Sequence, residues 1–195
     1  EYDNLIFVSR NIKTITIPSF IKKISSYSFS NSNIENIYIP SNIIEICECA
    51  FYKCFNLKYI EFSPDSNLEI IGKKAFENAK INSIIIPQSV KEIREMAFHK
   101  SCLMQIDIPK DANLKIIESF AFSKTYIDKI EIPLNVIKIC ECAFCGCQKL
   151  HEVKITNECN LRIIEKEAFK NTSITSFNIP SHLKIISAGT FSYCY

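Results

Sequence analysis

Glycine, tryptophan and long apolar runs are scarce or missing in this chain of 195 residues. Its three glycines are thin material for the glycine-rich loops that cradle phosphate groups. No apolar run approaches the ~18 residues that a membrane-spanning helix needs, so we expect no direct membrane insertion. The formal net charge is only +2, which gives no electrostatic case for binding nucleic acid. What remains is a chain with 47% hydrophobic residues, ample for a buried core.

Isoleucine, by contrast, makes up about a fifth of the chain and recurs at fixed spacing. Six Ile-Pro pairs mark the repeat: Ile17-Pro18, Ile39-Pro40, Ile86-Pro87, Ile108-Pro109, Ile132-Pro133 and Ile179-Pro180. Phe62 and Ile155 fill the two gaps, which gives eight units. A Phe follows in every unit, usually after Ala, and an Ile stands five residues before each, as Ile71 does before Phe76. Such a strict period marks a repeat architecture.

One unit reads as a short strand followed by a return path. In the pattern L/I-x-x-I-x-I-P the last two apolar residues lie two positions apart, so they point to one face of a strand that Pro ends. The segment before Ala-Phe, as in residues 165–169, fits a single helical turn. A unit this short cannot bury its apolar residues alone, whereas stacked copies can. The sequence therefore predicts a β-rich solenoid of about eight repeats of 22–25 residues. We expect a parallel β-sheet on its concave face and short strands, turns or single helical turns on its convex side.

The repeats run through the whole chain, so we expect a single array over residues 1–195 and no second domain. Phe7 precedes Ile12 by the five residues that also separate Phe29 from Ile34, so residues 1–10 are interpreted as the tail of a preceding repeat. Neither end carries the polar capping segment that solenoids normally need. We therefore expect either a fragment of a longer array, whose uncapped ends can self-associate, or a chain that ends against a partner.

The unit resembles the leucine-rich repeats of the BspA (Treponema-type) family, which read L-x-x-I-x-I-P-x-x-V-x-x-I-G-x-x-A-F-x-x-C. The Gly of that pattern is kept at Gly72, and its Cys at Cys54, Cys147 and Cys194. Units three and seven depart from it, because they lack the Ile-Pro pair and have longer loops. The resemblance implies a surface or secreted protein that binds host-cell or matrix proteins, as in bacteria and in mucosal protozoa such as trichomonads.

Ten cysteines invite a metal or disulfide interpretation, which their spacing does not favour. Cys54 and Cys147 fall three residues after a repeat Phe, an inward position where a small apolar side chain packs. The dense groups at 47–49 and 140–142 lie four units apart, roughly 20 Å by strand spacing, and cannot share a site. We expect mostly free, buried thiols with one surface disulfide at most, no metal site and no cofactor.

Catalysis finds little support in the sequence. His99, His151 and His182 fall in different units and at different phases of the repeat, so they do not converge. No serine stands in a nucleophile elbow. We expect no catalytic residues and a protein that is not an enzyme.

The outward positions of the predicted strands are where a solenoid selects its partner. Between the two strand apolar residues one side chain per unit points outward, and a second outward column precedes it. The candidate partner-binding residues in these columns are Tyr38, Tyr59, Glu61, Ile85, Asp107, Glu131 and Lys154. Aromatic anchors beside polar groups are typical of interface hot spots, although Tyr and Ile are also simply common in strands.

These observations predict a non-enzymatic protein-binding module, a surface-exposed adhesin-like ectodomain fragment that binds host-cell or matrix proteins through its concave sheet. The alternative is an intracellular leucine-rich-repeat scaffold that uses the same face. In that cytoplasmic setting the thiols stay reduced and the one N-x-S/T sequon, at Asn171, is never glycosylated.

Overall fold

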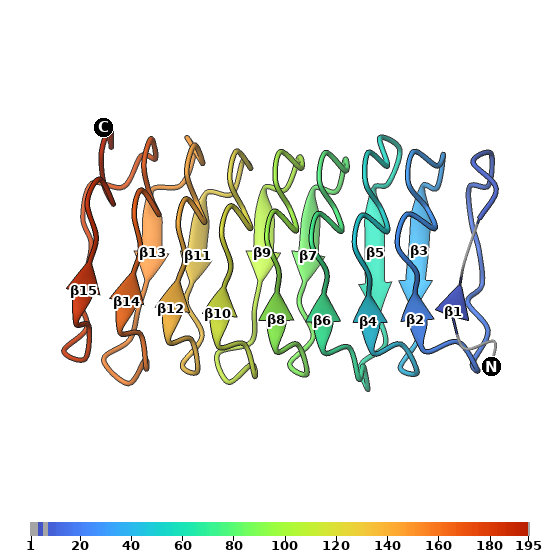
Figure 1. The fold of residues 1–195 in the computed structure, drawn as a ribbon, viewed down its shortest axis with the longest axis horizontal. Helices are drawn as coiled ribbons and strands as arrows, with labels where there is room; N and C mark the ends of the chain where they lie inside the picture. The colour runs from blue at the N-terminus through green and yellow to red at the C-terminus, as the bar shows by residue number, and fades with distance from the viewer. Residues whose placement is uncertain (1–3, 6–7, 195) are drawn as a thin grey trace.

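The computed structural model describes residues 4–5 and 8–194 as a parallel β-solenoid in which each repeat makes one turn (Figure 1). The turns stack side by side, so the two ends of the chain lie at opposite ends of the array. No helix occurs in the part of the chain that the structure describes. The predicted β-rich leucine-rich-repeat solenoid is confirmed.

One side of the solenoid is a continuous parallel sheet of nine two-residue strands. Most of these strands end at the inward Ile that precedes the repeat Phe, so that Ile46 pairs in register with Ile71. In chain order the strands are β1 (Asn4–Leu5), β2 (Lys23–Ile24), β4 (Glu45–Ile46), β6 (Ile70–Ile71), β8 (Glu92–Ile93), β10 (Ile116–Ile117), β12 (Lys138–Ile139), β14 (Ile163–Ile164) and β15 (Ile185–Ile186). The short strands expected on the side opposite the Ile-Pro strands are therefore present, and they pair with one another to form the longest sheet of the molecule.

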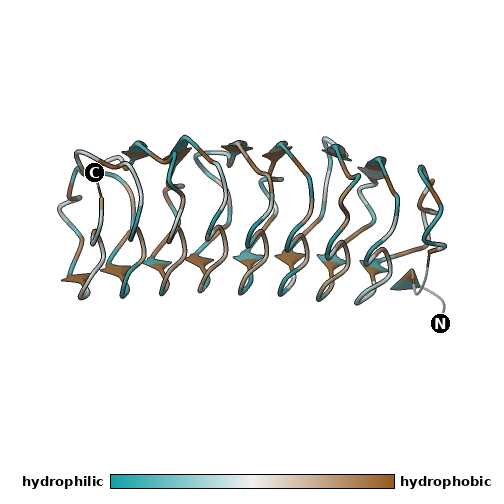
Figure 2. Ribbon diagram, turned by 90° about the horizontal axis from the view of Figure 1, so that it is seen from above, coloured by the Kyte–Doolittle hydropathy of each residue, from teal (hydrophilic) through white to brown (hydrophobic). Residues whose placement is uncertain are grey.

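The Ile-Pro strands lie on the opposite side, and they pair only two by two. They are β3 (Asn36–Ile39), β5 (Tyr59–Phe62), β7 (Ser83–Ile85), β9 (Gln105–Asp107), β11 (Lys129–Glu131) and β13 (Glu152–Lys154). The parallel pairs are β3–β5, β7–β9 and β11–β13. Figure 2 shows the two layers of strands on opposite sides of the turns. We call the solvent side of these six strands the Ile-Pro face.

Loop length explains where the Ile-Pro strands separate. We measure loop length as the number of positions from the inward residue that ends the Ile-Pro strand to the inward Ile of the next strand of the nine-stranded sheet. In unit four this separation is seven positions, from Ile86 to Ile93. It is nine in unit three, from Phe62 to Ile71, and nine again in units five and seven. The pairing breaks after β5 and after β9, each time on the far side of a unit with the longer loop. The longer loops noted in units three and seven thus recur in unit five, although that unit keeps its Ile-Pro pair.

The segment around each repeat Phe is a tight turn and not a helical one, so the expected single helical turn is wrong. Two residues before and two residues after each Phe the backbone has positive φ, as at Lys74 (55°) and Asn78 (57°) around Phe76. Such left-handed residues bend the chain sharply, whereas a helical turn needs negative φ throughout. Backbone hydrogen bonds to the next turn hold the bend, such as Phe76 N–H to the carbonyl of Ala97 at 2.7 Å.

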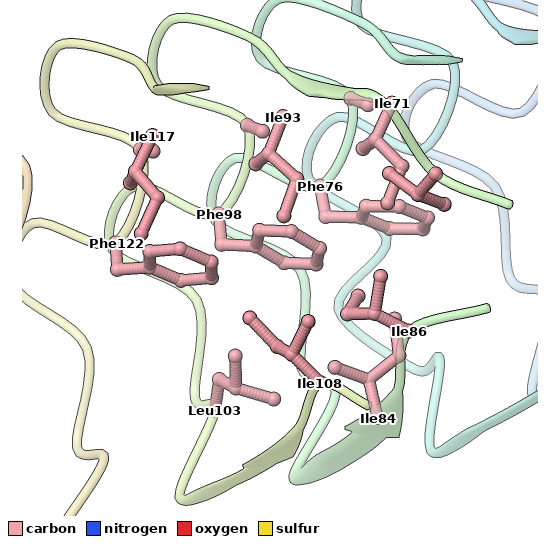
Figure 3. Packing of buried hydrophobic residues seen from close by; sticks show 14 of the residues in the cluster. Ile71, Phe76, Ile84, Ile86, Ile93, Phe98, Leu103, Ile108, Ile117 and Phe122 are labelled. Atoms are coloured by element: carbon pink, nitrogen blue, oxygen red, sulfur yellow. The ribbon is translucent and has the colours of Figure 1, made fainter. Parts of the chain in front are cut away.

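The repeat phenylalanines form one stacked column through the core. Their ring centroids lie 4.8–5.7 Å apart from Phe29 to Phe191, with interplanar angles of 5–12°. Phe76, Phe98 and Phe122 lie parallel in Figure 3, with the inward isoleucines packed above and below them. This is the inward position that the repeat predicts, and every interior ring of the column is fully buried.

The first strand, Asn4–Leu5, pairs in parallel with Lys23–Ile24, as each later strand of this sheet pairs with the next. Phe7, expected to be the repeat Phe of a preceding unit, lies outside the described residues. Among the described residues, the Val8 N–H donates to the carbonyl of Ser28 at 3.1 Å, as the Phe29 N–H donates to the carbonyl of Ala50 at 2.9 Å.

Candidate interaction surface on the Ile-Pro face

Alternation along the strands puts one set of side chains in the core and the other in solvent. In β3 the isoleucines at 37 and 39 are buried, whereas Asn36 and Tyr38 are exposed. Tyr38 is 47% exposed, and Tyr59 and Ile85 are each 66% exposed. Side chains this large and this open are the first requirement for a binding surface on a rigid sheet.

The strand register determines which of these side chains are neighbours. Tyr38 pairs with Glu61, and Tyr59 pairs with Asn36, so the two tyrosines lie on a diagonal and not directly opposite each other. Ile85 pairs with Asp107 in the next sheet. Glu61 therefore stands between Tyr38 and Ile85 in the outward column, and the aromatic patch expected from the sequence is interrupted by a carboxylate.

A groove of about 1040 Å³ opens on this face across units three to five. Its lining comes from β5, β7, β9 and the start of β11, and it includes Glu61, Ile85 and Asp107. Two longer loops border it with Pro64 and Asn113, and the shorter loop of unit four lies between them. The alternation of loop length thus makes a depression over unit four.

Carboxylates dominate the charge of this groove. Glu61 and Asp107 lie on either side of Ile85, and Asp128 lines the far end beside Lys129. None of the four charged side chains, Glu61, Asp107, Asp128 and Lys129, makes an ion pair within the described part of the chain. The groove therefore carries more negative than positive charge in a chain whose formal net charge is +2.

A smaller hollow of about 360 Å³ lies farther along the same face. It contains Glu131 and Lys154, which pair in register, together with His151 and Asn178. Lys154 also approaches Glu152 at 3.7 Å, so this part of the face is closer to neutral. Five of the seven candidate residues thus line one of the two depressions, and Tyr38 and Tyr59 continue the surface beyond them.

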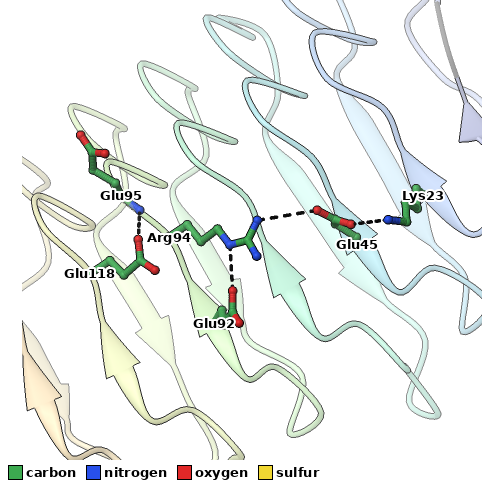
Figure 4. Close-up of polar contacts among 6 residues, drawn as sticks. All are labelled: Lys23, Glu45, Glu92, Arg94, Glu95 and Glu118. Atoms are coloured by element: carbon green, nitrogen blue, oxygen red, sulfur yellow. Dashed lines mark hydrogen bonds and ion pairs between the residues drawn. The ribbon is translucent and has the colours of Figure 1, made fainter.

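The opposite side of the molecule shows what a charge-compensated surface of this protein looks like. Along the nine-stranded sheet Glu45 contacts Lys23 at 2.7 Å and Arg94 at 3.9 Å, and Arg94 also contacts Glu92 at 2.8 Å (Figure 4). The Glu118 carboxylate accepts the backbone N–H of Glu95 at 2.8 Å. Exposed pairs of this kind contribute little to stability, but they leave these acids occupied, in contrast to Glu61, Asp107 and Asp128 of the groove.

The cysteines behave as core residues of the repeat. All ten are free in the structure, and six of them are buried. The Sγ of Cys147 donates to the carbonyl of Phe122 at 3.0 Å and lies 3.3 Å from Thr125 Oγ1. Burial raises the pKa of the Cys54 and Cys147 thiols to about 11, which keeps them protonated and poorly nucleophilic. No group of three or more metal-ligating side chains occurs within residues 4–5 and 8–194.

One row of residues whose types occur in catalytic sites, a Glu, a His and a Ser, was missed in the sequence. These residues become neighbours only when successive turns are stacked. Glu77, His99 and Ser123 each follow the repeat Phe by one residue in three successive units. The Ser123 hydroxyl donates to the carbonyl of Cys145 at 2.8 Å and not to the imidazole. His99 Nδ1 and Glu77 Oε2 are buried without a hydrogen-bond partner. This row of residues therefore lacks the hydrogen bonds that activate a serine nucleophile.

The chain belongs to the BspA type leucine-rich repeat family, whose repeat region is recognised in six copies over residues 3–104 and 69–195. A leucine-rich repeat protein from Bacteroides ovatus is 27% identical, with a TM-score of 0.76 over 88% of this chain and 44% of its own. The pneumococcal vaccine antigen PcpA is 24% identical, with a TM-score of 0.55 over 90% of this chain and 52% of its own. A leucine-rich cell surface protein from Faecalibacterium prausnitzii is 24% identical, with a TM-score of 0.57 over 94% and 46%.

The chain thus spans about half the length of these relatives. No curated protein is detectably similar to it. The residues described contain no helix that is long and apolar enough to cross a membrane. The fold and family are those of leucine-rich-repeat proteins, which are typically non-catalytic.

Proposed function

We propose that this chain is a non-enzymatic protein-binding module and that its partner docks on the Ile-Pro face. The observation that supports this most is the groove over unit four, where an exposed Ile85 lies between two carboxylates without ion-pair partners. Tyr38 and Tyr59 extend the same surface with two exposed rings. Apolar anchors surrounded by polar groups on a fixed framework are the usual composition of protein interfaces.

The fold suits this role because the surface is formed before the partner arrives. Backbone hydrogen bonds and the stacked Phe column join each turn to the next, so little conformational entropy remains to be lost on binding. Repeated weak contacts along an array, or copies on one cell, would add through effective concentration. We further propose that the chain is part of an adhesin-like ectodomain that binds host-cell or matrix proteins, supported by the vaccine antigen and the cell surface protein among its structural relatives.

The test is binding of the purified chain to epithelial cells and to immobilised matrix proteins. A variant with Tyr38→Glu, Tyr59→Lys and Ile85→Lys changes three exposed side chains of the Ile-Pro face. The matched control carries Ile116→Lys in the opposite sheet and Ile137→Lys directly before its strand β12, both at exposed residues. We expect saturable binding that the first variant loses by at least about tenfold in affinity and the control keeps, with equal melting temperatures. Binding that survives in the first variant would place the site elsewhere.

An intracellular scaffold would use the same face, and the ten free thiols are compatible with a reducing compartment. The two settings differ in a chemical mark. Asn171 is exposed at the end of a turn, so its side chain is accessible to a glycosyltransferase. In the native organism a glycan at Asn171 would support the surface assignment, and cytoplasmic fractionation of an unglycosylated chain would support the scaffold.

A further inference from the structure

The groove over unit four has a chemistry that selects among protein partners, and the inference drawn from it rests on the proposed function. We propose that this groove takes an extended segment of the partner that presents an apolar side chain flanked by lysine or arginine. Three features of the groove carry the argument, namely an apolar centre, uncompensated carboxylates on both sides of it, and free polar side chains beside it.

The apolar centre is Ile85. It is 66% exposed, whereas its chain neighbours at 84 and 86 are buried, and the other apolar strand residues that line the groove are at least half-buried. Covering its exposed side chain with an aliphatic or aromatic group from the partner removes apolar surface from water at no cost in buried polar groups. Proline and loop residues from units three and five border the groove, and we infer that an extended segment lies between them.

The charge around Ile85 is one-sided. Asp107 is its direct register partner, and Glu61 occupies the same outward position one unit earlier. The described residues supply no cation within ion-pair distance of either carboxylate. A lysine or arginine one or two residues from the apolar side chain of the partner would meet these carboxylates, and arginine can do so with two parallel hydrogen bonds.

Polar side chains suited to a peptide backbone lie in the neighbouring column. Ser83 pairs in register with Gln105, both line the groove, and neither makes a side-chain hydrogen bond among the described residues. By contrast Gln88 donates to Asp111 at 2.8 Å and Ser89 donates to the carbonyl of Leu68 at 2.8 Å, so those two polar groups are already occupied. An extended segment brings amide groups that lose water on docking and need such partners.

Size also favours a segment of several residues over a single side chain. Pockets that hold drug-sized ligands enclose about 300–1000 Å³, and this groove has about 1040 Å³. It remains open to solvent along the face, so the segment can enter and leave it as part of a larger partner.

Three labelled peptides with blocked ends test the proposal by fluorescence anisotropy at about 50 mM salt, where charge contacts are weakly screened. The first reads Arg-Ser-Leu-Ser-Arg, the second replaces both Arg by Glu, and the third replaces Leu by Ser. We expect the first to bind at least about tenfold tighter than either of the others. Binding of the acidic peptide with equal affinity would overturn the proposal.

Variants of the chain locate the site. The double variant Glu61→Gln with Asp107→Asn should weaken the first peptide at least about fivefold, and Ile85→Ser should do the same. The matched control, Glu48→Gln with Glu141→Gln, removes two exposed carboxylates far from the groove and should change nothing. Equal affinity for the groove variants and the control would contradict the assignment.

Competition separates this proposal from the proposed function. If the chain retains a matrix protein through the Ile-Pro face and the first peptide does not displace it, the basic segment is wrong and the binding module stands. If nothing binds on this face, both fail. Dimerisation of the chain that the groove variants abolish would assign the groove to a second copy and overturn the proposal.

Discussion

The environment of a single residue in this protein follows from its place in the repeat. In each of the eight units, the residue two positions before the repeat Phe and the residue two positions after it have positive φ. This holds for residues as different as Lys, Asn, Met and Tyr. Each non-glycine residue at these sites costs conformational energy, which the hydrogen bonds between turns must offset. The sequence contains no glycine signature at most of these sites, which is why the turn was expected to be helical.

His99 gives the folded state a pH dependence. Burial, together with Lys100, Lys124 and Lys74, lowers the pKa of its imidazole from 6.5 to about 4. Because the unfolded chain takes up this proton first, stability falls as the pH drops from about 6.5 towards about 4. We expect the free energy of unfolding to fall by about 2.5 kcal/mol over this window, which is less than the full pKa difference at about 1.4 kcal/mol per unit because the folded imidazole is itself half protonated at the lower end.

Urea unfolding at pH 7 and pH 4.5 measures this effect, with His99→Gln as the test and His151→Gln as the control on an exposed histidine. The first variant should lose most of the difference between the two pH values, and the second should keep it. An unchanged pH dependence in His99→Gln would show that other groups, such as the neighbouring Glu77, control it.

Gly72 is held by contact with the backbone of the preceding turn. A Cβ on this residue would lie 2.7 Å from the carbonyl oxygen of Ile46 and 2.8 Å from the carbonyl carbon of Cys47. Backbone cannot move aside as a flexible side chain does, so we expect Gly72→Ala to lower the free energy of unfolding by about 1–3 kcal/mol.

Gly146 provides the comparison for Gly72 in the same urea experiment. It has φ of +76°, and the closest atom to a Cβ there would be Cγ of the flexible Lys124 side chain at 3.2 Å, with the Lys124 backbone at an ordinary contact distance of 3.9 Å. Asn already occupies the equivalent place in other units, so Gly146→Asn should cost less than about 1 kcal/mol. A larger loss for Gly146→Asn than for Gly72→Ala would contradict the packing described.

Among the elements, the loops and not the strands create the candidate site. The strands repeat almost identically, whereas the loops alternate between two lengths and so raise ridges on either side of unit four. The solenoid, the Phe column and the inward place of Cys54 could be predicted because they depend on residues that recur in every unit. The groove and the breaks in strand pairing could not, because they arise from differences between neighbouring units that appear only when the turns are stacked.

Shortening the loop of unit three tests this role. Deleting the exposed residues Pro64 and Asp65 gives that unit the loop length of unit four and removes one ridge. We expect binding on the Ile-Pro face to fall at least about tenfold, with stability changed by less than about 1 kcal/mol because loop length has a small entropic effect. Deleting Asn157 and Glu158 from the loop of unit seven shortens an equivalent element outside the groove and should leave binding intact. If the two deletions change binding equally, the loop of unit three does not form the binding site.

The whole molecule is a rigid array with two chemically different faces. Along the nine-stranded sheet acids and bases compensate one another over the first four units, whereas the groove of the Ile-Pro face exposes Glu61, Asp107 and Ile85 without such compensation. On these grounds we expect a protein partner to dock on the Ile-Pro face.

Carboxylate footprinting of the complex tests that claim most directly. The chain is labelled on its acids with and without the matrix protein that it retains, and the modified peptides are quantified by mass spectrometry. The account predicts that Glu61, Asp107 and Glu131 lose at least about two thirds of their labelling in the complex, as expected for groups buried in an interface. Glu48, Glu69 and Glu141 should be labelled equally in both states. Protection of the second set without the first, or no retained protein at all, would contradict it.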